Sequence, residues 1–124
     1  MNLNEIGKKA RLAEPAVRKL GTAEKNTLLL HAAEALVRET PRILAANEKD
    51  MIRARERQMA QGLQDRLLLT PARIEGMAEG LRQVAALDDP VGEVVGMKRR
   101  PNGLLIGQKR VPLGVIGIIY EASR

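Results

Sequence analysis

The 124-residue sequence contains no cysteine, tryptophan or phenylalanine, and Tyr120 is its only aromatic residue. The absence of cysteine excludes a disulfide framework, a thiolate metal site and a cysteine nucleophile within these residues. It also fits a reducing cytoplasm, where we expect the protein to be located. Because aromatic side chains are missing, any core has to be built from leucine, isoleucine, valine, alanine and methionine.

Long apolar runs are missing as well. No stretch approaches the ~18 consecutive apolar residues of a membrane span. The first residues, MNLNEIGKK, have no apolar run behind their charges, as a secretory signal would. We therefore predict no membrane partner. The hydrophobic content of 44% is ordinary for a globular protein, and the length suits a single domain.

The net charge of +6 requires a nucleic-acid interpretation to be weighed. Acidic residues are interspersed among the lysines and arginines, and the densest basic groups, 98–100 and 109–110, flank a predicted turn. Single strands bind to aromatic side chains on which bases stack, and none lies near either group. We interpret the charge as a solvated basic surface and predict no nucleic-acid partner, with a basic nucleic-acid binder kept as an alternative.

The first ninety residues carry the apolar spacing that is typical of helices. Steps of three and four residues predict a helix over 3–20. A kink or break is expected near Glu14, because Pro15 removes a backbone donor and clashes with the preceding turn. Gly21 is predicted to end this segment and Thr22 to cap a second helix.

Two Thr-Pro pairs repeat one helix start signal. Thr40 and Thr70 are predicted N-caps, each followed by a proline at the first helical position. We expect the third helix to close at 61–62 and the fourth to end before 88–90, which makes four helices in all. Asn47, on the apolar side of the third helix, is predicted to be a hydrogen-bonded packing residue.

From residue 91 onward the pattern indicates β-structure. Residues 91–99 and 104–111 are predicted to pair as a hairpin, because the residues at 101–103, Pro-Asn-Gly, supply turn chemistry. Residues 115–120 form a β-branched stretch that is typical of a strand buried on both faces in a parallel sheet. The predicted fold class is α/β, with a helical layer, a β-ribbon and the first buried strand. Since such a strand needs parallel neighbours, we expect the chain to be the opening of a larger protein.

No combination of side chains forms a recognisable active site. His31 lies in the middle of a predicted helix without a local partner, and Ser123 has no glycine elbow around it. The pairs of neighbouring acids do not make a metal cluster. The glycines near the predicted strand do not match the dinucleotide-binding spacing G-x-G-x-x-G. We predict no catalytic residue and no metal site.

Residue by residue, by contrast, several stretches of the sequence resemble the gamma-glutamyl phosphate reductases, also called glutamate-5-semialdehyde dehydrogenases, of proline biosynthesis. The resemblance runs in order along nearly the whole chain and covers only the N-terminal minority of the family's length. Its most specific part is VPLGVIGIIYE at 111–121. The other matching stretches are ILAANEKD at 43–50, LQDRLLLTPARIEGMAEGLRQVAA at 63–86, DPVGEV at 89–94 and PNGL at 101–104.

The resemblance implies a branch of the aldehyde dehydrogenase superfamily. Such enzymes are oxidoreductases that reduce gamma-glutamyl phosphate with NADPH, through a cysteine thioester, to glutamate-5-semialdehyde and phosphate. It implies that 1–90 is the helical part of a cofactor domain, that 91–111 is a ribbon joining subunits of a homo-oligomer, and that 112–124 is the first strand of an incomplete Rossmann-like sheet. The implied cysteine would lie downstream of these residues.

The same resemblance implies where ligands would lie. Ile119, Tyr120 and Glu121 are candidates for contacts with NADPH, with buried strand positions as the alternative for Ile119 and Tyr120. Arg124 is a candidate for the substrate phosphate, although one extra residue precedes it relative to the family pattern. We expect a truncated or frameshifted reductase that is inactive as this isolated chain. The alternative is a small helical and ribbon interaction module without catalysis.

Overall fold

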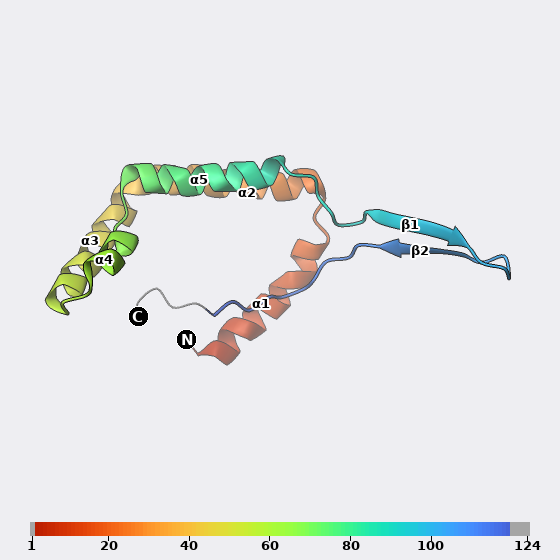
Figure 1. Cartoon of the computed structure of the whole chain (residues 1–124), viewed down its shortest axis with the longest axis horizontal. Helices are drawn as coiled ribbons and strands as arrows, with labels where there is room; N and C mark the ends of the chain where they lie inside the picture. The colour runs from red at the N-terminus through yellow and green to blue at the C-terminus, as the bar shows by residue number, and fades with distance from the viewer. Residues whose placement is uncertain (1, 120–124) are drawn as a thin grey trace. The chain divides into compact units, whose positions relative to one another are not determined.

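The computed structural model describes residues 2–119, which form five helices and two strands (Figure 1). Their bounds are α1 Leu3–Arg18, α2 Thr22–Arg38, α3 Thr40–Glu56, α4 Gln61–Leu67, α5 Pro71–Ala86, β1 Val94–Arg99 and β2 Leu105–Lys109. These residues fall into two compact units. The ribbon unit holds 2–22 and 88–118, and the helical unit holds 23–87 together with Ile119.

Helix α1 begins with a side-chain cap and runs without a break through its proline. The Asn2 Oδ1 atom accepts a hydrogen bond from the backbone N–H of Glu5 at 2.9 Å. The predicted break near Glu14 is therefore wrong, because Pro15 lies inside one continuous helix. A proline removes one backbone donor but its fixed φ is compatible with the helix, and the Glu14–Arg18 ion pair bridges the turn that contains it. No residue of α1 is buried.

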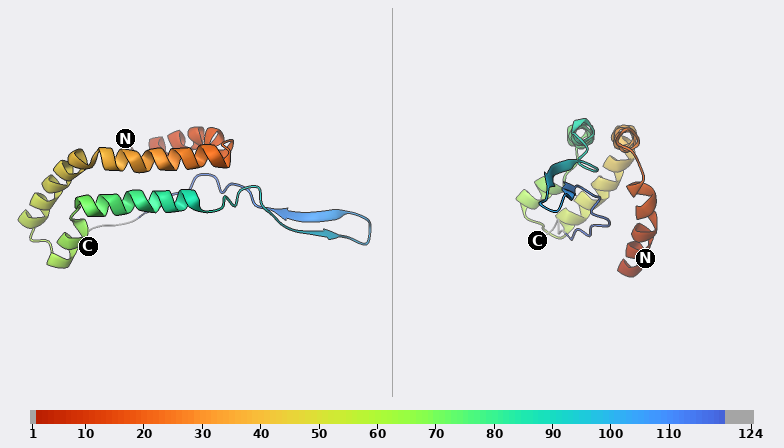
Figure 2. Two further views of the ribbon diagram at one scale, coloured as in Figure 1. Left: turned by 90° about the horizontal axis from the view of Figure 1, so that it is seen from above. Right: turned by 90° about the vertical axis from the view of Figure 1, so that its right-hand side faces the viewer.

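The helical unit has a small aliphatic core. Helix α3 contacts both α4 and α5, and Figure 2 shows α5 running alongside α2. The fully or nearly fully buried side chains come from α2, α3 and α5, and they are Ala33, Met51, Ala54, Ile74 and Ala78. Most other apolar side chains of this unit keep part of their surface open, so the core is a narrow seam made by these few positions of α2, α3 and α5.

Asn47 is the buried polar residue of that seam, and it confirms the prediction made for it. It is 7% exposed. Its Nδ2 atom donates to the carbonyl of Leu67 at 2.9 Å, and its Oδ1 atom accepts from the backbone N–H of Leu69 at 2.9 Å. These two bonds hold the link between α4 and α5 against α3. Arg73 adds to the link by donating to the carbonyls of Asp65 and Leu68.

The two Thr-Pro pairs behave differently. Thr70 is the N-cap of α5 as predicted, and its side chain accepts from the backbone N–H of Arg73. Thr40 is not a cap, because it is already the first residue of α3 and Glu39 takes the cap position. The Thr40 hydroxyl instead donates to the carbonyl of Leu36 in α2. The chain passes from α2 to α3 with almost no linker, so no extended residue is available for capping.

The predicted hairpin is confirmed with shorter strands. β1 and β2 pair antiparallel, with Met97 opposite Gly107 and Arg99 opposite Leu105. In the turn, Gly103 has a φ of +86°, which a residue without a Cβ adopts at no steric cost. Two further backbone hydrogen bonds between 92–93 and Arg110 extend the pairing toward the base of the ribbon. All residues of both strands are exposed.

The predicted buried strand at 115–120 is wrong for its described part. Residues 111–119 follow β2 without forming a helix or a strand, and all of them are exposed. A strand buried on both faces needs hydrogen-bonded neighbours and covering layers, and the described residues supply neither. The closing position of the prediction, Tyr120, lies outside the described residues.

Candidate functional site

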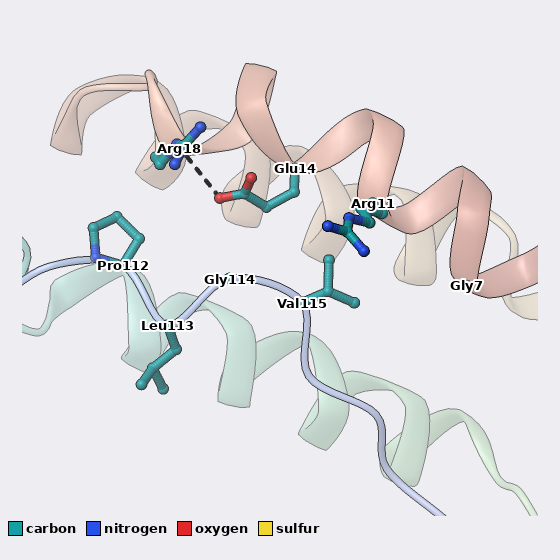
Figure 3. Close-up of a pocket in the computed structure, with 8 residues that line it drawn as sticks. All are labelled: Gly7, Arg11, Glu14, Arg18, Pro112, Leu113, Gly114 and Val115. Atoms are coloured by element: carbon teal, nitrogen blue, oxygen red, sulfur yellow. Dashed lines mark ion pairs between the residues drawn. The ribbon is translucent and has the colours of Figure 1, made fainter.

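The ribbon unit contains a shallow cleft of about 510 Å³ between one face of α1 and the chain that leaves β2 (Figure 3). Gly114 turns this chain with a φ of +88°, which favours glycine. The polar side chains of the cleft come from α1 alone. Its lining residues are Gly7, Arg11, Glu14, Arg18, Pro112, Leu113, Gly114 and Val115.

The charges of the cleft are partly balanced. The Arg18 Nε atom lies 3.5 Å from the Glu14 Oε1 atom, as the dashed line in Figure 3 marks. Figure 3 also shows Arg11 beside Val115, further along the helix. The three charged residues share one face because they lie three and seven positions apart. The cleft offers guanidinium groups to an anion or a peptide backbone, but its lining includes no nucleophile.

A second hollow of about 480 Å³ lies on the ribbon itself, lined by residues of β1, β2 and the adjoining turn. The Met97 side chain fills the space above Gly107 on the paired strand. A Cβ atom placed on Gly107 would lie 2.0 Å from the Met97 Sδ atom and 2.9 Å from the Gly96 carbonyl oxygen. A side chain at Gly107 would therefore require Met97 to move and the Gly96 carbonyl to shift, whereas Gly96 has open space around it.

Of the site residues predicted from the resemblance, only Ile119 lies within the described residues. Ile119 is 100% exposed and lines neither cleft. Tyr120, Glu121 and Arg124 lie outside the described residues. The charged face of α1 was not predicted from the sequence. The i, i+3, i+7 spacing of Arg11, Glu14 and Arg18, beside the apolar stripe of the same helix, was the signal that could have found it.

Metal and membrane chemistry find no support in the described part of the chain. Residues 2–119 contain no group of three or more side chains placed to hold a metal ion. No helix in this range is both long and apolar enough to cross a bilayer.

On α5, hydrogen bonds from Arg82 to Glu75 and Glu79 raise the pKa of the Arg82 guanidinium. This arginine is charged at any ordinary pH, so the group acts as a surface ion-pair network.

Comparison with known proteins gives information on function that the residues lining the two clefts do not. No family model matches the chain. Among curated proteins, it is 53% identical over 121 residues to the gamma-glutamyl phosphate reductase of Lachnospira eligens, covering 98% of this chain and 29% of that protein. It is 57% identical over 116 residues to the same enzyme of Moorella thermoacetica, covering 94% and 28%.

The fold agrees with these relatives. The crystal structure of gamma-glutamyl phosphate reductase from Thermotoga maritima matches with a TM-score of 0.85 and 41% identity, over 90% of this chain and 27% of that one. The five helices and the ribbon thus reproduce one part of a larger reductase. The chain is homologous to the N-terminal part of gamma-glutamyl phosphate reductase, and it spans about 29% of the length of the curated relatives it matches.

Proposed function

We propose that this chain supplies the N-terminal part of an NADPH-dependent reductase that converts gamma-glutamyl phosphate to glutamate-5-semialdehyde and phosphate in proline biosynthesis. The observation that carries the proposal is identity of about one residue in two along nearly the whole chain, over a shared fold. The intact protein acts in the cytoplasm as a homo-oligomer. Within it, 1–90 belongs to the cofactor domain, 91–111 is the subunit-joining ribbon and 112–124 opens the cofactor sheet.

The described residues do not by themselves fit NADPH. A dinucleotide needs backbone groups at a strand-to-helix turn, whereas 111–119 are exposed and form no strand. In the proposal, Ile119, Tyr120 and Glu121 contact the cofactor and Arg124 the substrate phosphate only once the remaining sheet surrounds them. Because these 124 residues contain no cysteine, the thiol that would accept the acyl group has to lie outside them.

The purified 124-residue chain is accordingly expected to show no turnover. The assay is the phosphate-dependent oxidation of glutamate-5-semialdehyde with NADP⁺, followed at the nicotinamide absorbance. An intact gamma-glutamyl phosphate reductase, such as that of Thermotoga maritima, is the positive control. Turnover above the enzyme-free blank, persisting through a second purification step, would contradict the dependence on an external cysteine.

A second candidate function is an interaction module without catalysis. The observation that favours it is the ribbon, whose two strands are exposed along their whole length. Each strand has one edge left unpaired by the other, and an open edge is a template for strand addition. Such a module would bind an intact reductase subunit, which co-purification with the tagged enzyme measures. If the chain is instead part of a reductase, it has to be joined in one polypeptide to the catalytic part of that enzyme.

A further inference from the structure

The turn that joins β1 to β2 (Figure 1) contains the only Asn-Gly pair of the chain, Asn102 and Gly103. Glycine has no Cβ atom, so no side chain shields the Gly103 nitrogen from the side-chain amide that precedes it. An asparagine whose carboxamide carbon meets such a nitrogen can close a cyclic imide with it. The other four asparagines, at positions 2, 4, 26 and 47, are each followed by a residue that carries a side chain.

A hydrogen bond places the two reacting groups in one small ring. The Asn102 Oδ1 atom accepts from the backbone N–H of Leu104 at 3.1 Å, as asparagine side chains often do two residues ahead in a turn. Both the Asn102 Cγ atom and the Gly103 nitrogen lie on the covalent path between the bonded atoms. The side-chain amide is therefore folded back over the peptide that contains its nucleophile.

The turn is closed by its own residues. The Gly103 N–H donates to the carbonyl of Arg100 at 2.9 Å, and the Arg100 N–H donates to the carbonyl of Leu104 at 2.7 Å. All of these bonds join residues within 100–104, so the geometry of the turn does not depend on chain outside the ribbon.

The electrostatic surroundings favour attack on the amide. Negative charge develops on the Asn102 Oδ1 atom as the nitrogen attacks, and the Leu104 N–H already donates to this atom. The basic residues at 98–100 add positive charge beside the turn. Residues 100–104 are exposed, so hydroxide and water reach them. The hydrogen bond from Gly103 to Arg100 opposes the reaction, because it has to open before the nitrogen loses its proton.

We propose that Asn102 is a self-modification site, at which the folded chain converts its own asparagine to aspartyl and iso-aspartyl residues. Hydroxide removes the proton of the Gly103 N–H, the nitrogen attacks the Asn102 Cγ atom, and the bond from Cγ to Nδ2 breaks to release ammonia. Water then opens the imide at one of its two carbonyls. The reaction consumes only water, and the proposal does not rest on the proposed enzymatic function.

The two products differ in their effect on the ribbon. Each replaces an amide with a carboxylate and lowers the formal net charge of +6 by one. The aspartyl product keeps the main chain, and with it the hydrogen bonds of the turn. In the iso-aspartyl product the main chain runs through the former side chain and is longer by a methylene group. The bonds between Arg100 and Leu104 and between Gly103 and Arg100 then lose their geometry, so the tip of the ribbon loosens with time.

A time course of the purified 124-residue chain at mildly alkaline pH tests the site. Trypsin releases Asn102 in a peptide spanning 100–109, where it is the only asparagine. Mass spectrometry measures the acid formed, chromatography separates the two products, and an unaged sample digested in parallel gives the background. We expect Asn102 to be converted at least about tenfold faster than the other four asparagines together, at a rate that rises with pH.

Two glycine variants test the nucleophile. Gly103→Ala should slow the conversion at least about tenfold, because a Cβ atom then crowds the attacking nitrogen. Gly96→Ala is the matched control on the same ribbon, where a Cβ atom meets open space, and it should leave the rate unchanged. Circular dichroism verifies that both variants keep the helix content of the unchanged chain.

An aspartate variant tests the loosening of the ribbon. Asn102→Asp carries the new carboxylate without the longer main chain. Hydrogen exchange of the Arg100 amide, measured by NMR, should be faster in the isolated iso-aspartyl product than in both Asn102→Asp and the unmodified chain.

Three results would overturn the proposal. The first is a wild-type chain in which Asn102 is converted no faster than the other asparagines. The second is an equal rate in the wild type and Gly103→Ala, which would show that the Gly103 nitrogen is not the nucleophile. The third is equal exchange of the Arg100 amide in the iso-aspartyl product and in Asn102→Asp, which would show that the ribbon keeps its turn.

Discussion

Replacing Asn47 with alanine should destabilise the helical unit by about 1–3 kcal/mol, because two half-buried backbone groups lose their partner at once. The Asn47 amide satisfies the carbonyl of Leu67 and the N–H of Leu69, at 2.9 Å each. Without it, both half-buried groups stay unpaired, or water has to replace the amide between α3 and the α4–α5 link. The free energy of unfolding, from urea titration followed by circular dichroism, measures the effect.

The matched control is Asn4→Ala on α1, where the side chain is exposed. Its stability should stay within about 0.5 kcal/mol of the wild type, as is usual for surface substitutions. An aspartate at position 47 is a sharper variant, because a carboxylate can still accept from Leu69 but cannot donate to Leu67. Equal unfolding free energies for Asn47→Ala and Asn4→Ala would show that the amide does not hold the link.

The second large effect is expected at Ile74, the largest fully buried side chain of the described residues. Ile74→Ala should cost about 2–4 kcal/mol, through lost apolar burial and the cavity that remains. Met77→Ala on the same helix is the control, because Met77 is 43% exposed and its truncation opens no enclosed space. The same urea titration compares the two, and a smaller loss for Ile74→Ala than for Met77→Ala would contradict the position of the core seam.

Local signals in the sequence predicted what depends on local chemistry. Thr70 begins α5 because its hydroxyl and the following proline act within one turn. The ribbon forms where a Pro-Asn-Gly turn separates two apolar stretches, and its glycine does adopt the positive φ. Asn47 was predicted from its place on an apolar helix face, where a polar side chain needs partners.

The failures come from interactions that a local pattern does not contain. Thr40 has the same neighbour as Thr70, but the direct passage from α2 into α3 leaves it no capping conformation. α4 was not predicted as a separate helix because its seven residues, one of them a glycine, span too few turns for a helical period to be recognised. Residues 115–119 have the composition of a buried strand, yet burial requires partner strands that the described residues do not provide.

For function, too, some features could be predicted from the sequence and others could not. The family resemblance predicted the reductase activity that the names of the relatives state. The residues by themselves predicted no catalytic group. The α1 cleft was not predicted, since its lining joins residues about 100 positions apart in the sequence. Such a juxtaposition follows from tertiary structure, which periodicity along one helix does not contain.

A chimera can test whether these residues act as the N-terminal part of a gamma-glutamyl phosphate reductase. Residues 1–119 would replace the aligned part of the Moorella thermoacetica enzyme, to which this chain is 57% identical. The unmodified enzyme and the chimera with its catalytic cysteine replaced by alanine are the controls.

The measurement is kcat/KM for the phosphate- and NADP⁺-dependent oxidation of glutamate-5-semialdehyde. We predict a value within about tenfold of the unmodified enzyme, that is, a loss of at most about 1.4 kcal/mol of transition-state stabilisation. A chimera that is folded and soluble but no faster than its cysteine-free control would show that these residues cannot act as the N-terminal part of the enzyme.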